Sequence, residues 1–278
     1  MNATILNARA RYFEATSETP WMSVKYMISG SARYQVGRSE YEVGQGRCLI
    51  LNNGSPYRIT INSSDTVESL VVFFPPDHVA SMIGSLTHTD EQLLDNPFTA
   101  SDSSFRFQES IYLVDRSFRE ALGNIQRENL ISENRRGLTH ESVEALFRTC
   151  LSSQSDITRD LKRLDAIRPA TRQELQRRLT IARDYLLSNY SAKLSLNQIA
   201  GICGLSPYHL SRQFKTVYGI PPMTFLRDFR LSRAIALLRS TNKTVLDVCL
   251  EVGFESPTTL SSRIKALTGS SPRKLRKE

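Results

Sequence analysis

Residues 196–215 of this chain read LNQIAGICGLSPYHLSRQFK, which is the pattern of two short helices joined by a tight turn. Ser195 and Ser206 are predicted N-caps, because a hydroxyl oxygen can accept a hydrogen bond from a free backbone N–H of the first turn. Gln198 follows Ser195 at the spacing of a capping box. Gly204 lies where the chain must turn, and glycine adopts a positive φ without strain. The pattern predicts a helix-turn-helix, whose second helix enters the DNA major groove.

The same pattern occurs again about 50 residues later. The equivalent pairs are Ile199/Val248, Ala200/Cys249, Gly204/Gly253, Leu210/Leu260, Phe214/Ile264, Lys215/Lys265, Gly219/Gly269 and Pro222/Pro272. The offset is 49 residues before the turn and 50 after it, so the second turn is predicted to be one residue longer. The repeat predicts two helix-turn-helix units, at 195–216 and 244–266.

A single helix is predicted between the two units, from Pro222 to Arg239. Its 18 residues would span about 27 Å at 1.5 Å per residue. One turn of DNA is about 34 Å long. A helix of this length can therefore hold two recognition helices in successive segments of the major groove.

The stretch SLNQIAGICGLSPYHLSRQFKTVYGIPPMTFLRDFRLSRAIALLRSTNKTVLDVCLEVGFESPTTLSSRIKALTGSSPRKLR resembles the AraC/XylS family of bacterial transcription regulators. The resemblance implies an all-α, double helix-turn-helix DNA-binding domain at 172–278. It also implies RNA polymerase as a partner, and an N-terminal sensor half. The text YEVGQGRCLILNNGSPYRI is similar to the cupin-type sensor barrel of the same family.

Charge is distributed unevenly along the 278 residues, a length that is sufficient for two domains. Residues 172–278 hold 18 Lys and Arg against 7 Asp and Glu, a net charge of +11, whereas residues 1–171 hold 18 against 21, a net charge of −3. A basic half can simply be a soluble basic surface. Because the basic half coincides with the repeat, the charge favours DNA as the partner of that half.

Cysteine spacing and hydropathy indicate a soluble, cytoplasmic protein with reduced thiols. The four cysteines show no CxxC spacing, and Cys203 and Cys249 fall on the predicted apolar helix faces. Neither a signal peptide nor an apolar run of about 18 residues is present. We expect no membrane contact.

Residues 1–76 have the composition of an antiparallel β-structure. Runs rich in Val, Ile, Tyr and Phe alternate with turn signals at Gly30, Gly37, Gly44–Gly46, Asn53-Gly54 and Pro75-Pro76. The predicted strands are Ser23–Ile28, Ala32–Val36, Cys48–Leu51, Tyr57–Ile61 and Val67–Phe74. The fold class predicted for the whole chain is a two-domain α+β protein with an N-terminal cupin-like barrel.

The barrel is expected to bind no metal and no cofactor, because none of the four histidines lies in the strand region and none forms an HxH pair. Its interior could hold a small organic effector or could be a packed core. Trp21, Arg33 and Tyr57 are candidates for the lining of an effector pocket, and each could equally be an ordinary strand residue.

Residues 77–165 are predicted to be mainly helical and to complete the first domain, 1–165. Leu113, Phe118 and Leu122 begin one apolar series, and Val143, Leu146, Phe147 and Leu151 form another at helical spacing. These residues could pack against the barrel or form a homodimer contact, which the resemblance adds. A linker is predicted at 166–171, where Thr171 and Glu174 have capping-box spacing and begin a helix that ends near Asn189.

In the first unit, Arg212 is the strongest candidate for a base contact, because arginine can donate two hydrogen bonds to guanine O6 and N7. Ser211, His209 and Tyr208 flank it and could reach bases or phosphates. Lys215 lies later on the helix and is predicted to contact phosphate. For Arg212 the alternative is an ordinary solvated surface charge.

The second unit departs from the family pattern. The resemblance places arginine at the position of Ser262, and Arg263 lies one residue later, about 100° around the helix. Pro257, Thr258, Ser261 and Ser262 remain as base-reading candidates, with fewer donors. The phosphate candidates of this unit are Arg263, Lys265, Arg273 and Lys274, which would position the protein without specifying sequence.

Together these features predict a sequence-specific activator of transcription that binds double-stranded DNA and is not an enzyme. Two alternatives stay open. One is a cupin-like enzyme fused to a DNA-binding half, and the other is a regulator with no small-molecule effector.

Overall fold

The computed structural model describes residues 3–87, 105–131, 138–162 and 169–275, and the chain divides into two compact units, Met1–Arg159 and Asp160–Glu278. Side chains are described for all of these residues except 84–87, 131, 156–162 and 169–170. The predicted linker at 166–171 falls partly outside the described residues. Those of its residues that are described, 169–171, are helical.

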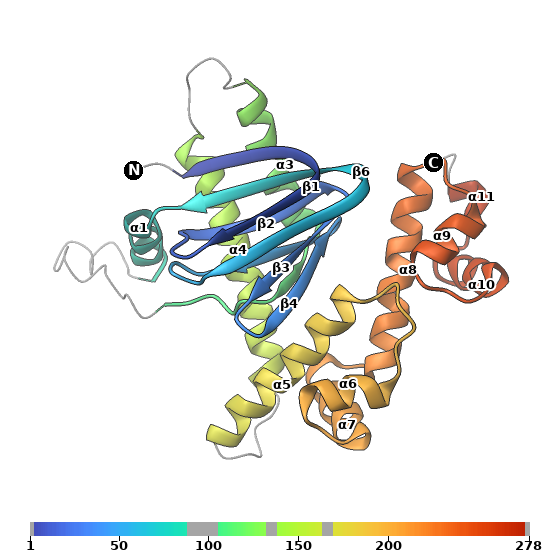
Figure 1. Ribbon diagram of the computed structural model, residues 1–278. Coiled ribbons are helices and arrows are strands. Elements are labelled where there is room, and N and C mark those ends of the chain that lie inside the picture. Colours follow the sequence, from blue (N-terminus) through green and yellow to red (C-terminus); the bar gives the residue numbers. More distant parts are fainter. Residues whose placement is uncertain (1–2, 88–104, 132–137, 163–168, 276–278) are drawn as a thin grey trace. The chain divides into compact units, whose positions relative to one another are not determined.

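Within the described residues, the first unit contains one antiparallel sheet of seven strands, coloured blue to green in Figure 1. The strands are β1 (Thr4–Ser17), β2 (Met22–Ser29), β3 (Ser31–Val36), β4 (Ser39–Gly44), β5 (Arg47–Leu51), β6 (Tyr57–Phe74) and β7 (Ile111–Leu113). β6 pairs with β1 along nearly its whole length, with β3 near its start and with β2 near its end. This double pairing curls the sheet into a nearly closed barrel.

The two faces of β2 have different neighbours, because successive side chains point to opposite sides of a strand. Val24 and Phe74 lie on the face that meets the helices, where the ring of Phe74 is 5.9 Å from that of Phe147. Ser23 and Lys25 lie on the other face, which lines the barrel. Both faces of β2 are buried near its start.

Among the described residues, the first unit also contains the helices α1 (Pro76–Thr87) and α3 (Arg116–Ile131) and most of α4 (His140–Lys162). Val143, Leu146 and Phe147 of α4 are at most 1% exposed. The packing interpretation is therefore confirmed for these three residues, which are too deeply covered to form a dimer contact. Leu151, the last member of the predicted series, is partly exposed.

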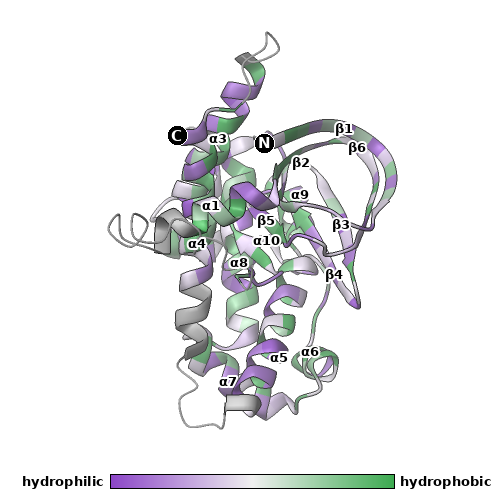
Figure 2. Cartoon of the chain, turned by 90° about the vertical axis from the view of Figure 1, so that its left-hand side faces the viewer, coloured by the Kyte–Doolittle hydropathy of each residue, from purple (hydrophilic) through white to green (hydrophobic). Residues whose placement is uncertain are grey.

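Several strand predictions agree with β2, β3 and β5, and others need correction. Tyr57–Ile61 and Val67–Phe74 are one strand, since β1 pairs across the polar residues between them. β1 and β4 were not predicted. Leu113 begins no helix: it pairs with Arg47 in the short strand β7 and is 40% exposed. The curved end of the β1–β6 ribbon is largely hydrophilic (Figure 2), which is why no strand pattern was recognised there.

All regular structure among the described residues of the second unit is helical. Its helices are α5 (Pro169–Ser188), α6 (Leu196–Cys203), α7 (Pro207–Tyr218), α8 (Pro222–Ser240), α9 (Val245–Glu251), α10 (Pro257–Thr268) and α11 (Pro272–Leu275). Thr171 is not an N-cap as predicted, because the helix already begins at Pro169, and proline is favoured in a first turn. Within the described residues, no helix has the length and apolar character that crossing a membrane requires.

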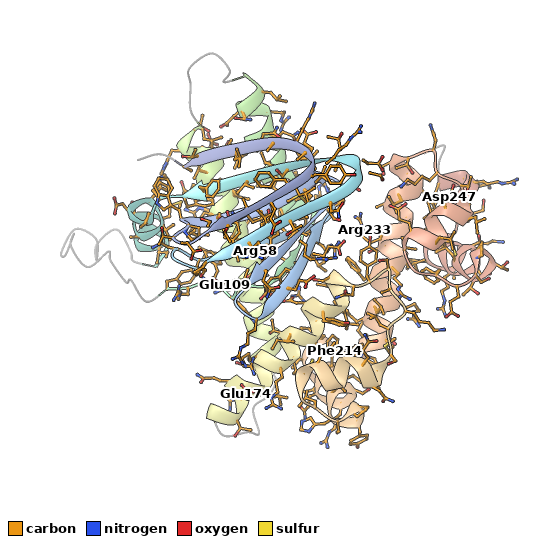
Figure 3. The ribbon with its side chains drawn as sticks, in the orientation of Figure 1. Arg58, Glu109, Glu174, Phe214, Arg233 and Asp247 are labelled. Atoms are coloured by element: carbon orange, nitrogen blue, oxygen red, sulfur yellow. The ribbon has the colours of Figure 1, made fainter. Side chains whose placement is uncertain are left out.

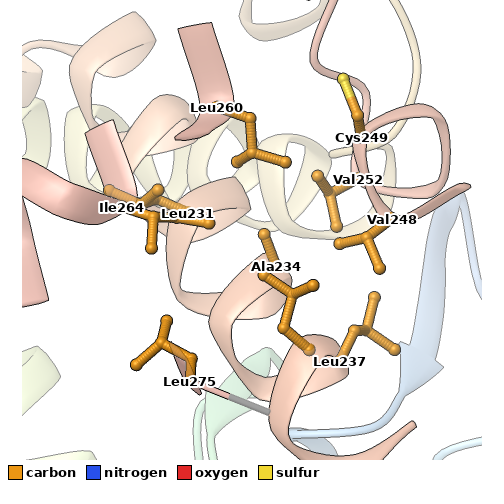
Figure 4. Packing of buried hydrophobic residues seen from close by; sticks show 10 residues of the cluster. Leu231, Ala234, Leu237, Val248, Cys249, Val252, Leu260, Ile264 and Leu275 are labelled. Atoms are coloured by element: carbon orange, nitrogen blue, oxygen red, sulfur yellow. The ribbon is translucent and has the colours of Figure 1, made fainter. Parts of the chain in front are cut away.

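Two hydrophobic cores lie on either side of the long helix α8. In the first, Phe214 of α7, labelled in Figure 3, is fully buried. Its ring lies 5.6 Å from that of Phe225 of α8. Figure 4 shows the second core, which gathers residues of α8 to α11. Its buried members are Leu231, Ala234, Leu237, Leu238, Val248, Cys249, Val252, Leu260, Ile264 and Leu275. α8 therefore contributes to both helix-turn-helix units.

Candidate nucleic-acid interface and barrel site

The caps predicted for the first helix-turn-helix are present. The Ser195 and Ser206 hydroxyls accept hydrogen bonds from the backbone N–H groups of Gln198 and His209, each at 3.2 Å. Gly204 has a φ of +63° and turns the chain between α6 and α7. The predicted capping box is only half formed, because the Gln198 side chain donates to the Tyr185 hydroxyl instead of returning to Ser195.

α7 presents a polar outer face above a buried inner face. Leu210, Phe214 and Val217 are fully buried. The predicted contact residues Tyr208, His209, Arg212 and Lys215 are exposed, and Ser211 is partly exposed. The Arg212 guanidinium makes no hydrogen bond or ion pair with any described residue, whereas the Arg212 backbone carbonyl accepts from the Thr216 hydroxyl. The guanidinium donors therefore remain available for a ligand. The outer face of α7 contains no acidic residue.

α10 has the same scaffold and a different surface. The Ser256 hydroxyl caps it by accepting from the Thr259 N–H at 3.4 Å. The Ser262 hydroxyl donates to the Thr258 carbonyl oxygen of its own helix at 3.0 Å. Of the predicted contact residues, Thr258, Ser262, Arg263 and Lys265 are exposed on α10, as are Arg273 and Lys274 on α11, whereas Pro257 and Ser261 are partly exposed.

The first helix of the second helix-turn-helix, α9, has a complete capping box. The Thr244 hydroxyl accepts from the Asp247 N–H at 3.1 Å, and the Asp247 carboxylate accepts from the Thr244 N–H at 3.0 Å. The Thr244 hydroxyl also donates to the Asp247 carboxylate at 2.6 Å, and this bond, followed by the one from the Thr244 N–H, holds the pKa of Asp247 below its ordinary value. This box was not predicted, although its T-x-x-D spacing is visible in the sequence.

The barrel side chains predicted to line an effector pocket do not come together. Arg33 lies on the outer side of β3, where its Nε is 2.8 Å from the Glu40 carboxylate and its side chain is 62% exposed. Arg33 is therefore not a lining residue, because its neighbour Tyr34 takes the inward position. Trp21 is 37% exposed. Tyr57 does face the interior, where its ring is 5.8 Å from that of Tyr34.

The polar centre of the barrel is Lys25, which the sequence analysis missed. Lys25 is 1% exposed, and its Nζ donates to the Tyr57 hydroxyl at 2.9 Å. The amine also lies over the rings of Tyr57 and Phe73, at 4.2 and 4.6 Å from their centroids. No described carboxylate pairs with it. Burial lowers the pKa of Lys25 from its ordinary 10.5 to about 7, because a poorly solvated site disfavours the charged form.

Two further polar groups accompany Lys25 without partners. The hydroxyls of Ser23 and Tyr34 are buried and make no hydrogen bond with the described residues. A buried hydroxyl without a partner is costly, so native proteins usually satisfy it with water or a ligand. We call Ser23, Lys25, Tyr34 and Tyr57 the barrel polar cluster. The one available sequence signal was a lysine inside the apolar run Met22–Met27.

A separate cavity of about 450 Å³ opens beside the barrel. Its walls include Met22, Asn52, Ile83 and Arg106. Met22 points to the opposite face of β2 from Ser23 and Lys25, so this cavity lies outside the barrel polar cluster. Asn52 is already engaged, since its side chain donates to the Phe107 carbonyl oxygen and accepts from the Phe107 N–H.

Two of the four histidines meet at the barrel periphery. The rings of His78 on α1 and His140 on α4 have centroids 5.6 Å apart. Among the described residues, no group of three His, Cys, Asp or Glu side chains is placed to hold a metal ion.

A β-barrel unit joined to a basic pair of helix-turn-helix units is the architecture of a DNA-binding transcription regulator. Family models match both parts: an AraC-like ligand binding domain matches residues 7–149, and a helix-turn-helix domain matches residues 199–278. The chain belongs to the AraC/XylS family of transcription regulators.

Individual relatives match about a third of the chain. It is 33% identical over 93 residues to the bifunctional transcriptional activator/DNA repair enzyme AdaA of Bacillus subtilis. It is 34% identical over 88 residues to the transcriptional activator AarP of Providencia stuartii. These matches cover 34% and 32% of this chain, and 44% and 65% of the two relatives. The chain therefore spans less than two thirds of either relative's length.

Solved structures give similar matches. An AraC-type DNA-binding regulator from Chromobacterium violaceum is 33% identical, with a TM-score of 0.35, and covers 37% of this chain and 92% of its own. ToxT from Vibrio cholerae is 12% identical, with a TM-score of 0.36, and covers 99% of this chain and 98% of its own.

Proposed function

We propose that this protein activates transcription by binding double-stranded DNA, with α7 and α10 in successive segments of the major groove. The observation that supports this most directly is the pair of capped helices with buried inner faces and exposed, acid-free outer faces. Arg212 would read bases, with Tyr208, His209, Ser211 and Thr258 as further base contacts. Lys215, Arg263, Lys265, Arg273 and Lys274 would contact phosphates.

The proposal is tested by selecting duplexes from a random-sequence pool with the full chain, then comparing the selected duplex with a scrambled one. We expect at least a hundredfold preference for the selected duplex at physiological salt, since specific sites typically exceed random DNA by 10³ or more. Equal binding to both duplexes would contradict sequence-specific regulation.

We further propose that the protein works in the cytoplasm as a homodimer, contacts RNA polymerase, and has no enzymatic activity. The family resemblance supports these points. Because the apolar stripe of α4 is buried, a dimer contact must use another surface. Sedimentation of the full chain across the micromolar range tests the dimer, and a strict monomer at all concentrations would contradict it.

We propose that the barrel polar cluster binds a small organic effector through an anionic group. An amine buried without a carboxylate partner would be stabilised in its charged form by such a ligand. Thermal unfolding of the full chain with a panel of small carboxylic acids tests this. Stabilisation of the wild type but not of Lys25→Met, with Arg33→Met as the exposed control, is expected. Stabilisation of Lys25→Met by the same acid would place the site elsewhere.

The buried amine also predicts a pH dependence. Between about pH 7 and 10.5 the unfolded chain binds more protons at Lys25 than the folded chain does. The free energy of unfolding should therefore rise with pH across that window, by up to about 1.4 kcal/mol per pH unit. Below about pH 7 Lys25 is charged in both states, and the full free-energy cost of burying the charged amine lowers the stability. Unfolding free energies of Lys25→Met should lack this slope, whereas those of Arg33→Met should retain it.

A further inference from the structure

The two helix-turn-helix units are joined by more than α8. The connection between α5 and α6, residues 189–195, leads directly into the first helix-turn-helix unit but packs against the second. Tyr190 joins the periphery of the second core, and its ring lies edge-on to that of Phe229 at 5.2 Å. We call residues 190–193 the bracing loop.

Arg230 of α8 ties the bracing loop to the long helix. Its Nε donates to the Tyr190 carbonyl oxygen at 2.5 Å, and its Nη2 donates to the Ala192 carbonyl oxygen at 2.6 Å. A guanidinium that donates to two carbonyls at once constrains orientation as well as distance, because its donors have a fixed fork geometry. An ion pair between Lys193 and Glu255, at 3.6 Å, is exposed on both sides and adds little.

Gly253 lies in the turn of the second helix-turn-helix, and its backbone contacts the bracing loop. A Cβ placed on Gly253 would lie 2.4 Å from the Ser191 carbonyl oxygen and 2.8 Å from its carbonyl carbon. Neither atom belongs to a flexible side chain, so any residue with a Cβ would push the loop and the turn apart. Glycine is therefore needed here for close approach as well as for its φ of +76°.

The equivalent glycine of the first unit has no such contact. Gly204 has a φ of +63°, and a Cβ there would meet only the end of the Arg178 side chain, at 3.2 Å. Both glycines have a positive φ, but only at Gly253 would a Cβ meet the backbone of the bracing loop. This pair offers a natural control, because alanine strains both turns and separates only one from its neighbour.

We propose that the bracing loop fixes the distance and angle between α7 and α10, so that the protein selects DNA by the spacing between its two half-sites. Gly253, Arg230 and Tyr190 are then positioning residues that touch no DNA. The inference rests on the proposed function, because both helices must enter the groove. One base pair shifts a half-site by about 3.4 Å and rotates it by about 35°. A braced pair of helices cannot follow such a change, whereas an unbraced pair can.

The test measures the affinity of full-length variants for three duplexes: the selected site, and the same site with one base pair inserted or removed between half-sites mapped by footprinting. The wild type and Gly204→Ala should lose at least tenfold in affinity when the spacing changes. Gly253→Ala should bind the site with native spacing about tenfold more weakly than the wild type does. On each site with altered spacing, its affinity should be within threefold of the wild-type affinity for that same site. Identical spacing profiles for Gly204→Ala and Gly253→Ala would overturn the proposal, as would a uniform loss on all three duplexes.

A second pair of variants covers the case in which Gly253→Ala does not fold. Arg230→Gln removes the double hydrogen bond to the bracing loop, and Arg227→Gln alters a half-exposed arginine of the same helix that pairs with Asp228. Arg230→Gln should reduce the spacing preference at least threefold, and Arg227→Gln should leave it unchanged. Equal profiles for these two variants also overturn the proposal. A wild type that does not distinguish the selected from a scrambled duplex would instead refute the proposed function.

Discussion

The first and second helix-turn-helix units share a scaffold and differ on their surfaces. Both recognition helices have a serine cap followed by proline, and both end at a glycine with a positive φ. Their outer faces have diverged, since Arg212 of α7 has Ser262 as its counterpart on α10. The comparison shows that packing constrains the buried positions of the two units, whereas their exposed positions can differ in the DNA contacts that they make. We expect α7 to supply more of the specificity and α10 more of the general affinity.

The largest expected difference concerns the two cores. Phe214 fills the first and Ile264 occupies the equivalent place in the second, both fully buried. Phe214→Ala should lower the free energy of unfolding by about 3–5 kcal/mol, and Ile264→Val by about 0.5–1.5 kcal/mol, because the cost follows the volume removed. Urea denaturation gives both values, with the exposed Tyr208→Ala as control. A loss below about 1 kcal/mol for Phe214→Ala would mean that the first core is not closely packed around this ring.

The next largest effect concerns sequence discrimination, which we expect to depend on Arg212 and not on Ser262. Arg212→Ala should weaken binding to the selected duplex by about 1–3 kcal/mol and relax preference at one or two base pairs. Ser262→Ala should change affinity by less than about 0.5 kcal/mol, because water readily replaces an exposed hydroxyl that already bonds its own helix. Isotherms on selected and scrambled duplexes decide between them. If Ser262→Ala costs more discrimination, α10 is the principal reader.

A smaller and more uniform effect is expected at Lys215 and Lys265, which occupy equivalent positions. Replacing either with alanine should weaken selected and random DNA by similar factors, and should reduce the slope of log affinity against log salt by about 0.9, the value for one phosphate contact. Titrations at several salt concentrations measure the slope. An unchanged slope for only one variant would mean that its helix does not contact the backbone there.

The smallest effect concerns the caps, which differ between the units. Asp247 of the second unit has a pKa below its ordinary 3.8, so the box with Thr244 stabilises the fold above that pH and loses its effect as the pH falls through the lowered value. Asp247→Asn should be less stable than the wild type near pH 6, and the two should converge only when the pH has fallen below the lowered pKa of Asp247. Gln198→Ala in the first unit should show no such pH dependence, because Gln198 does not ionise.

Local signals explain what the sequence could predict. Ser195, Ser206 and Gly204 act on residues within a few positions of themselves, so the caps and the turn of the first unit were predictable. Gln198 was assigned correctly to the first turn and wrongly to the capping box. Its side chain reaches Tyr185 on another helix, and a partner 13 positions away in the chain cannot be recognised from local spacing.

Long-range contacts explain what the sequence could not predict. Arg33 and Tyr34 are adjacent, and only the pairing of β3 decides which faces the barrel. Lys25 belongs to a polar cluster because its amine donates to the hydroxyl of Tyr57, which lies 32 positions away in the chain. The special position of Gly253 depends on Ser191, since Gly204 has an equivalent sequence context and no backbone contact. These features require the assembled fold.

The long pairing of β1 with β6 has a consequence for how the chain folds. Thr4 pairs with Phe73 and Ser17 with Tyr57, so this ribbon brings together residues separated by 40 to 69 positions. Closing such loops costs chain entropy before any contact repays it, and folding rates fall as contact order rises. The helical half of the chain, residues 160–278, is held together more by contacts between residues close in sequence. We therefore expect refolding to be kinetically biphasic, with the DNA-binding half forming first and the barrel following more slowly.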